Sequence, residues 1–141
     1  MVNKHVRKVL GVVLGVGAGV FINILFGAIS SYSVDVLKGT DISDAEAMAQ
    51  EAAALPVSAW LLTLLGAVLG SFLAGVIGAA ISKEETVWIT SIIGGGLFLF
   101  PGVYILIVTS APLWYNIPNL ISYFLFSYLG GVAIMRVDLL T

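Results

Sequence analysis

The longest uncharged stretch of this chain covers residues 86–135, which are fifty consecutive positions without Asp, Glu, Lys or Arg. Hydrophobic residues make up 60% of the 141-residue chain and charged residues 10%, and the mean hydropathy is +1.10. A soluble domain of this length has too little interior to bury so much apolar surface, whereas a lipid bilayer accepts it. The sequence therefore predicts an integral membrane protein in contact with membrane lipid, with a single domain over residues 1–141.

Four apolar stretches are long enough to cross a bilayer as helices. They cover residues 9–30, 56–82, 86–109 and 118–136. The first stretch gives about 33 Å of helix at ~1.5 Å per residue, which matches a hydrocarbon core of roughly 30 Å. The alternative, that this stretch is the core of a signal peptide, is disfavoured because such cores have only ~7–15 residues. We expect an all-α membrane protein, a four-transmembrane-helix bundle.

The cationic residues are distributed unevenly about these four spans. Five of them fall on one side, against Lys38 alone on the other: Lys4, Arg7, Lys8, Lys83 and Arg136. Loops rich in Lys and Arg stay on the cytoplasmic side of a membrane. Both termini are therefore predicted to be cytoplasmic (N-in, C-in), and the predicted location is the cytoplasmic (inner) membrane of a bacterium.

The polar segment between the first two spans, residues 33–55, is acidic and extramembrane. Within it, Ser43-Asp44-Ala45-Glu46 fits a capping box, and the helix-favouring residues 45–55 follow. Apolar residues recur there at helical spacing: Ala45, Met48, Ala52 and Leu55. This pattern predicts a short amphipathic helix on the membrane surface or over the outer mouth of the bundle. A solvated connecting helix is the alternative.

Aromatic residues lie near the ends of the predicted spans. Trp60, Trp114 and Tyr115 fall near the outer boundary, and Trp88 falls near the inner one. Such rings are typical interface anchors, although packing inside the bundle is the alternative for each. The uncharged segment 111–119 contains two prolines, so it is expected to be non-helical and to lie in the headgroup layer, as an anchor or as a lip for a lipid or partner.

Two prolines carry further structural expectations. Pro118 suits the first turn of the fourth helix, where its missing N–H costs nothing. Pro101, followed by Gly102, falls inside the third span and is expected to kink it, because it removes a backbone hydrogen bond and crowds the preceding turn.

Small residues recur every fourth position on the first two spans. The positions are Gly11, Gly15 and Gly19 on the first helix and Gly66, Gly70, Ala74 and Gly78 on the second, with Gly130 extending the pattern on the fourth. Such faces let helix backbones approach closely in lipid. They indicate either packing within the chain or association with other transmembrane helices.

The predicted spans contain no Asp, Glu, Lys or His, and their one Arg is Arg136, the last residue of the fourth span. Ionisable groups inside a membrane usually mark proton relays and coupled transport, so a proton-coupled transporter is disfavoured. The polar residues of the spans are neutral. Most Ser and Thr are expected to bond carbonyls of their own helix, and Asn23 is expected to bridge two helices.

No residue is predicted to be catalytic, to bind a cofactor or to ligate a metal. The chain has one histidine, His5, and no cysteine. Asp41, Asp44 and Glu46 could hold a divalent cation loosely, but helix capping accounts for the last two. The net charge of −2 is too mild to indicate nucleic-acid binding.

Parts of the chain resemble a group of small, uncharacterised bacterial four-span membrane proteins. The likeness lies in residues 69–80, in Gly94-Gly95-Gly96, and in residues 110–115, a Pro-hydrophobic-Trp-aromatic motif before the last helix. The resemblance implies the four-span fold and no established activity. Some members carry histidines where this chain has Ala67 and Ala111, so no histidine-dependent role is implied.

These features favour a non-catalytic membrane subunit that packs against copies of itself or against a larger membrane complex. The alternative is a small homo-oligomeric channel or transporter for a neutral solute or ion, whose pore would be lined by hydroxyls and carbonyls. A membrane enzyme acting on lipid would need a pocket that converges on acidic residues near the outer interface.

Overall fold

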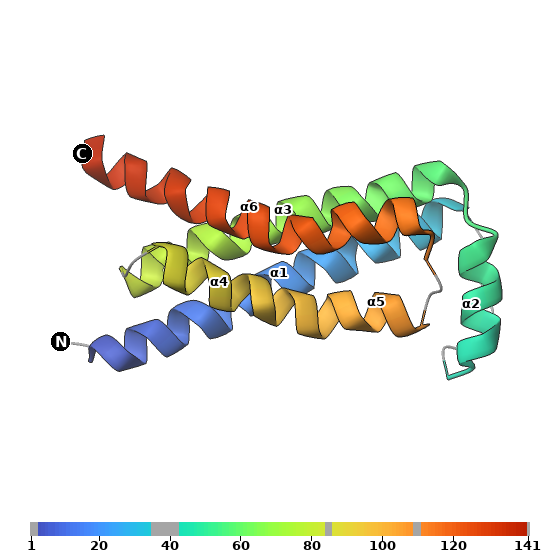
Figure 1. The fold of residues 1–141 in the computed structure, drawn as a ribbon, viewed down its shortest axis with the longest axis horizontal. Coiled ribbons are helices and arrows are strands. Elements are labelled where there is room, and N and C mark those ends of the chain that lie inside the picture. The colour runs from blue at the N-terminus through green and yellow to red at the C-terminus, as the bar shows by residue number, and fades with distance from the viewer. Residues whose placement is uncertain (1–2, 35–42, 84–85, 109–110, 141) are drawn as a thin grey trace.

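A computed structural model describes residues 3–34, 43–83, 86–108 and 111–140, and this part of the chain is all-helical (Figure 1). Its elements are α1 (Lys4–Val34), α2 (Ala45–Ala53), α3 (Val57–Ser82), α4 (Thr86–Leu97), the π-helical turn η1 (Phe98–Gly102), α5 (Val103–Val108) and α6 (Leu113–Leu140). Within these ranges, four stretches are long and apolar enough to span a membrane: Lys4–Ser30, Val57–Ser82, Thr86–Ile107 and Leu113–Val137. The predicted all-α fold, with four helices long and apolar enough to span a membrane, is confirmed.

The four long helical rods lie side by side along one axis, and α2 lies across one end of them (Figure 1). The start of α1, the end of α3, the start of α4 and the end of α6 lie at the opposite end. The five cations that the sequence groups together therefore share this end, which we call the N-terminal end of the bundle: Lys4, Arg7, Lys8, Lys83 and Arg136.

Glycines bring α1 and α3 into backbone contact. A Cβ added at Gly15 would lie 2.8 Å from the carbonyl oxygen of Ala74, and one at Gly70 would lie 2.8 Å from the carbonyl oxygen of Gly19. One turn nearer the N-terminal end, a Cβ at Gly11 would lie 2.9 Å from the carbonyl oxygen of Gly78. These separations leave no room for a side chain, so the small-residue faces hold α1 and α3 together.

The remaining predicted small residues also pack within the chain. Gly66 receives the side chain of Phe26, Ala74 is fully buried, and Gly130 lies against the carbonyl of Phe72. The eight positions predicted to serve packing or a partner are thus filled by neighbours from the same chain. They present no open surface to another subunit.

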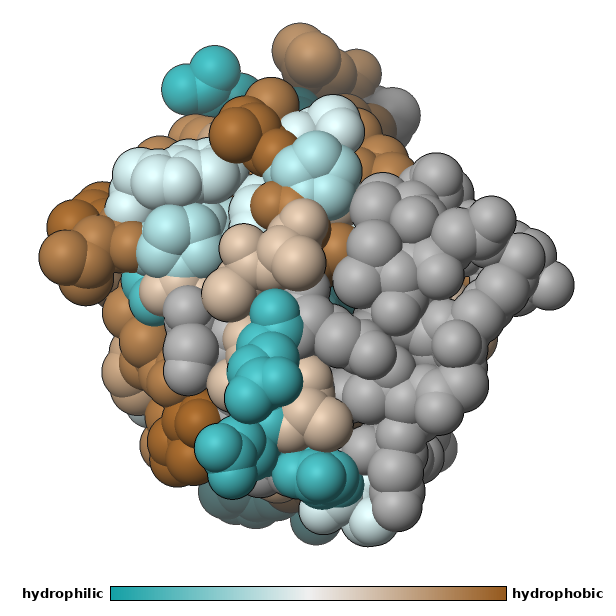
Figure 2. Space-filling view, turned by 90° about the vertical axis from the view of Figure 1, so that its right-hand side faces the viewer, coloured by the Kyte–Doolittle hydropathy of each residue, from teal (hydrophilic) through white to brown (hydrophobic). Residues whose placement is uncertain are grey.

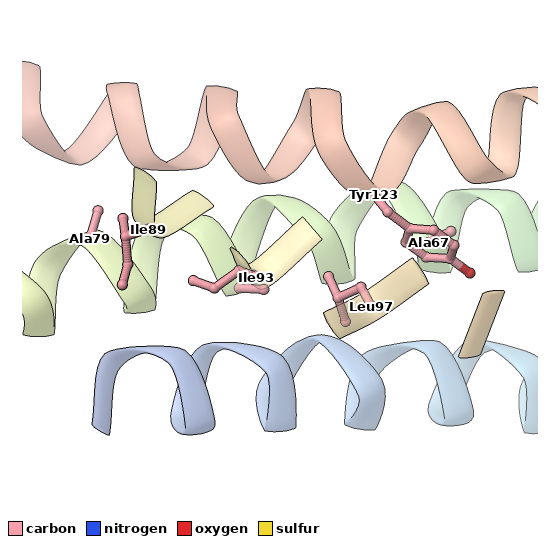
Figure 3. Packing of buried hydrophobic residues seen from close by; sticks show 7 residues of the cluster. Ala67, Ala79, Ile89, Ile93, Leu97 and Tyr123 are labelled. Atoms are coloured by element: carbon pink, nitrogen blue, oxygen red, sulfur yellow. The ribbon is translucent and has the colours of Figure 1, made fainter. Parts of the chain in front are cut away.

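The main apolar core lies between α3, α4 and α6 (Figure 3). Ile89, Ile93 and Leu97 form one stripe of α4 and are fully buried, since residues four apart share a face of a helix. They pack against small residues of α3 and against the ring of Tyr123 from α6, which reaches Ala67 in Figure 3. Large apolar side chains cover the outside of the bundle, as a lipid-facing surface requires.

The third span changes helix type where the sequence predicts a kink at Pro101 and Gly102. Residues Phe98–Gly102 form a π-helical turn, closed by the N–H of Val103 donating to the carbonyl of Phe98. Pro101 has no N–H for the α-helical bond, and a wider turn moves the bonding pattern by one residue. A Cβ at Gly102 would lie 2.9 Å from Cε2 of Tyr123, so this glycine admits the ring.

The fourth helix begins at Leu113, five residues before the predicted start at Pro118. The expectation that two prolines keep residues 111–119 from forming helix is wrong. Pro112 precedes the helix, and its carbonyl accepts the N–H groups of Tyr115 and Asn116, both at 3.0 Å. Pro118 lies inside the helix and removes one backbone donor, which the surrounding turns tolerate.

Hydrophilic side chains gather over the end of the bundle that carries α2 (Figure 2). Asp44 caps this helix, because its Oδ1 accepts the N–H groups of Glu46 at 3.0 Å and Ala47 at 3.1 Å. The cap is therefore Asp44, where the sequence predicts a box closed by Ser43. The side chains of Ala45, Met48 and Ala52, which define the predicted apolar face, lie outside the described ones.

Candidate functional site

The inward face of α6 carries polar side chains, which reverses the pattern of a soluble amphipathic helix. Six residues form this α6 polar row, and all are buried: Tyr115, Asn116, Asn119, Ser122, Tyr123 and Ser127. The outward face carries exposed Ile117, Ile121 and Phe124. Polar groups in a membrane protein face the bundle interior because lipid cannot hydrogen-bond them. The row is the candidate site that the geometry provides.

Hydrogen bonds link the middle of the row into a ladder. The hydroxyl of Tyr115 donates to Oδ1 of Asn119 at 3.5 Å, and Nδ2 of Asn119 donates to the hydroxyl of Tyr123 at 3.2 Å. The three residues are four apart, so one helix face aligns them. Asn119 supplies both an acceptor and a donor, which is what an amide between two hydroxyls must do.

The end of the row nearer the N-terminal end of the bundle joins three helices. Ser127 Oγ contacts the carbonyl oxygens of Thr90 on α4 at 3.2 Å and of Phe124 on its own helix at 3.0 Å. The backbone of Ser127 also lies against Gly75 of α3, where any Cβ would collide with the Ser127 carbonyl. A glycine at position 75 is therefore what lets α3 and α6 meet at this level.

The end of the row nearer α2 is a pair of contacting rings tilted by 50°, and this corrects two of the predicted interface anchors. Trp60 is 7% exposed and Tyr115 is 0% exposed, and their ring centroids lie 4.7 Å apart. Both pack inside the bundle because each ring covers the other and Ala111 closes the same cluster. Trp88 and Trp114 are 47% and 45% exposed, as an interface position requires.

Two buried polar atoms have no hydrogen-bond partner in the described structure. Asn116 donates through Nδ2 to the carbonyl of Ala111 at 2.8 Å, but its Oδ1 is unpaired. The other atom is Oγ of Ser82, which lies against Gly11 at the N-terminal end. An unpaired buried acceptor costs about 1–3 kcal/mol, so Asn116 Oδ1 is the position of the row most ready to accept a donor from outside the chain.

The polar residues elsewhere in the spans serve mainly their own helices. Ser71 donates to the carbonyl of Ala67 at 2.6 Å, and Thr63 donates to that of Ala59 at 3.0 Å, which confirms the prediction for Ser and Thr. Asn23 was expected to bridge two helices, yet it donates to Gly19 of its own helix at 2.9 Å. Ser30 makes a bond between α1 and α3 instead, by donating to the carbonyl of Ala59 at 2.9 Å.

The row can donate and accept hydrogen bonds, but its side chains are hydroxyls and amides. Such groups fit neutral polar solutes, water or partially dehydrated ions. In the described part of the chain, no group of three or more His, Cys, Asp or Glu is placed to hold a metal ion. Nothing in the row therefore points to a particular reaction.

Sequence reasoning missed Asn116 and Asn119 because it assigned them to a loop. The signal that could have found them is the four-residue spacing of Tyr115, Asn119, Tyr123 and Ser127. These residues share one face only if the helix continues through Pro118. No family model, curated protein or solved structure matches this chain. The resemblance to small bacterial four-span proteins therefore stays a prediction.

Proposed function

We propose that this protein is a non-catalytic subunit of a membrane assembly, which associates with other transmembrane helices through the outward face of α1. The observation that carries the proposal is Gly17. A Cβ at this position would meet nothing within 4 Å, in contrast to the filled positions at Gly15 and Gly19 on the same helix. Packing within the described chain therefore does not require a glycine at position 17.

The cost of Gly17 supports a role outside the chain. Glycine in a helix interior is about 1 kcal/mol less favourable than alanine, and here no contact in the described structure offsets it. On the outward face, the small residue leaves a notch among exposed large apolar side chains: Leu10, Val13, Leu14, Phe21 and Ile24. A neighbouring helix that enters such a notch gains close backbone packing, the main attraction between helices in lipid.

The burial of the four spans agrees with this choice of surface. Only 22% of the most apolar window of α1 is buried, against 44% for α3. A helix at the edge of a bundle, with one face packed and the other open, is the natural place for another subunit to bind. Copies of this chain and a larger complex are the two candidate partners.

The proposed membrane is the bacterial inner membrane, with both termini in the cytoplasm. The five cations gathered at the N-terminal end support this orientation by the positive-inside rule. In this orientation α2 lies at the outer face as a surface helix. Exposed Trp88 and Trp114 would then lie in the two headgroup layers.

Disulfide crosslinking tests the proposed surface, because the chain has no cysteine and a single introduced one is unique. Val13→Cys and Ile24→Cys place a thiol on the outward face of α1, and Ile121→Cys is the matched exposed control on α6. Oxidation in native membranes should give adducts with the α1 variants and none with the control. Adducts of twice the chain mass would identify a second copy, and other masses a larger complex. Equal or absent crosslinking at all three positions would refute the proposal.

The second candidate, a small channel or transporter for a neutral solute, is favoured by one observation, the α6 polar row. Six neutral polar side chains line one buried face of a membrane-spanning helix. Vesicles that contain the protein should then pass glycerol or water faster than protein-free vesicles do, and Asn119→Leu should reduce the rate. Identical rates with and without protein would reject this candidate.

A further inference from the structure

The line along which α1 and α4 lie together carries a cation at one end and apolar residues along its length. We name it the α1–α4 seam and define it by six residues: Lys8, Val12 and Val16 of α1 with Trp88, Ile92 and Gly95 of α4. The two helices touch along this line. A Cβ at Gly15 would lie 3.1 Å from Cδ1 of Ile93, and one at Gly96 would lie 2.9 Å from Cγ2 of Val16.

We propose that the α1–α4 seam binds an anionic phospholipid from the leaflet at the N-terminal end. The phosphate of the headgroup lies against Lys8 and Lys4, and one acyl chain follows Ile92 and Gly95 toward the middle of the bilayer. The contact between Lys8 and Trp88, the open position at Gly95 and the positive charge of this end of the bundle support the proposal.

The mouth of the seam is formed by a lysine and a tryptophan. Nζ of Lys8 lies over the ring of Trp88, 5.1 Å from the centroid, and this cation–π contact holds the ammonium group at the entrance. Trp88 is exposed, and an indole at the membrane boundary suits the headgroup layer. Lys4 precedes Lys8 by one helical turn and therefore extends the positive charge toward the aqueous side.

The exposed side of α4 next to α1 is apolar and open at one position. Trp88 and Ile92 are exposed, and a Cβ at Gly95 would meet nothing within 4 Å, so this surface has room for an acyl chain there. From Trp88 to exposed Leu99 the helix rises about 16 Å, at ~1.5 Å per residue. This is close to half of a roughly 30 Å hydrocarbon core, the depth that one leaflet supplies.

Charge identifies the headgroup. By sequence, the N-terminal end of the bundle carries five Lys or Arg against Glu84, Glu85 and Asp138, a net charge of 5 − 3 = +2. The segment 33–55, next to the other end, carries Lys38 against five Asp or Glu, a net charge of 1 − 5 = −4. An anionic headgroup is complementary only to the first end. At the same end, Nε of Arg7 donates to the carbonyl of Ile81 at 3.2 Å at the end of α3.

Quenching of Trp88 fluorescence by brominated lipids tests the proposal on the full-length protein. Trp114→Phe removes the other exposed indole, and buried Trp60 contributes a constant signal. The protein is reconstituted in vesicles of unlabelled phosphatidylcholine with increasing brominated phosphatidylglycerol or brominated phosphatidylcholine. We expect the anionic lipid to quench at a mole fraction about fivefold lower for each cation that it contacts, the ratio that corresponds to ~1 kcal/mol.

Variants separate the seam from general attraction of the leaflet. Lys8→Gln should lower the preference for phosphatidylglycerol about fivefold, and Lys8→Arg should retain it. Arg136→Gln removes a cation at the same end but on α6, and should leave the preference unchanged. Gly95→Leu fills the open space at this position and should weaken quenching. Gly17→Leu, at an equally open position on the outward face of α1, should not weaken it. Equal quenching by the two lipids, loss of the preference in Lys8→Arg, or an equal effect of Arg136→Gln would overturn the proposal.

Discussion

Replacing Gly15 and, separately, Gly17 by alanine tests how closely α1 and α3 pack. The two positions lie in one helix, so the ~1 kcal/mol by which alanine improves helix propensity over glycine is common to both variants. At Gly15 the new Cβ would lie 2.8 Å from the carbonyl oxygen of Ala74 and 3.1 Å from Cδ1 of Ile93, inside the roughly 3.5–4.0 Å of favourable contact. At Gly17 it would meet nothing within 4 Å. The difference in unfolding free energy between the variants therefore isolates overpacking, about 1–3 kcal/mol.

Unfolding in mixed micelles measures this difference. The purified protein in dodecyl maltoside is titrated with sodium dodecyl sulfate, and helix content is followed by far-ultraviolet circular dichroism. Gly17→Ala should unfold at a higher sulfate fraction than the unsubstituted protein. Gly15→Ala should be less stable than Gly17→Ala by a factor of roughly 5–150 in the folding equilibrium. Equal stability of the two variants would refute the close approach of the Gly15 and Ala74 backbones.

Three further substitutions test other parts of the structure. Pro101→Ala restores a backbone donor and should convert the π-helical turn to α-helix, which rotates α5 about its axis. Thiol labelling of a cysteine introduced by Tyr104→Cys, at a position that is exposed in the structure, detects this rotation. Arg7→Gln removes a charged donor from the carboxyl end of α3 and should cost about 0.3–1 kcal/mol in the same micelle titration. Asn119→Leu removes the two ladder bonds and, at roughly 0.6 kcal/mol each in a membrane, should cost about 1 kcal/mol, whereas a cost near zero would show that the ladder does not contribute to stability.

The lengths of the apolar stretches were enough to predict the four spans, because a bilayer sets a minimum helix length and forbids unpaired backbone within it. The start of α6 was not predictable in the same way. Pro112 and Pro118 are both consistent with a helix start, and the choice depends on the carbonyl of Pro112 accepting two backbone N–H groups and on Asn116 bonding Ala111. These contacts involve neighbours in space that a pattern of residue types does not specify.

The small-residue faces show a second limit of sequence reasoning. Spacing alone identified Gly15 and Gly70 as close-packing positions, and the structure puts both against carbonyl oxygens. Whether the facing backbone belongs to the same chain is a question of helix arrangement, on which the spacing is silent. Gly17 shows the converse. It lies outside the four-residue pattern, and it is open on the outward face of α1. For the same reason, Trp60 and Trp88 are equally plausible anchors in sequence, but only Trp88 is exposed.

The hydrogen bonds of the α6 polar row bear on the choice between the two proposed functions. A solute that passes along the row must replace the bonds of Asn119 to Tyr115 and Tyr123, and side-chain hydrogen bonds in membrane proteins are worth only about 0.6 kcal/mol. The bonds themselves are therefore a weak barrier. The stronger one is packing, because Gly75 and Gly102 bring α3 and η1 against Ser127 and the Tyr123 ring. Opening a path would separate these backbones and lose close contacts that lipid does not replace. The geometry thus favours the row as an internal support for α6, and the outward face of α1 is the surface through which we propose that the bundle contacts a partner.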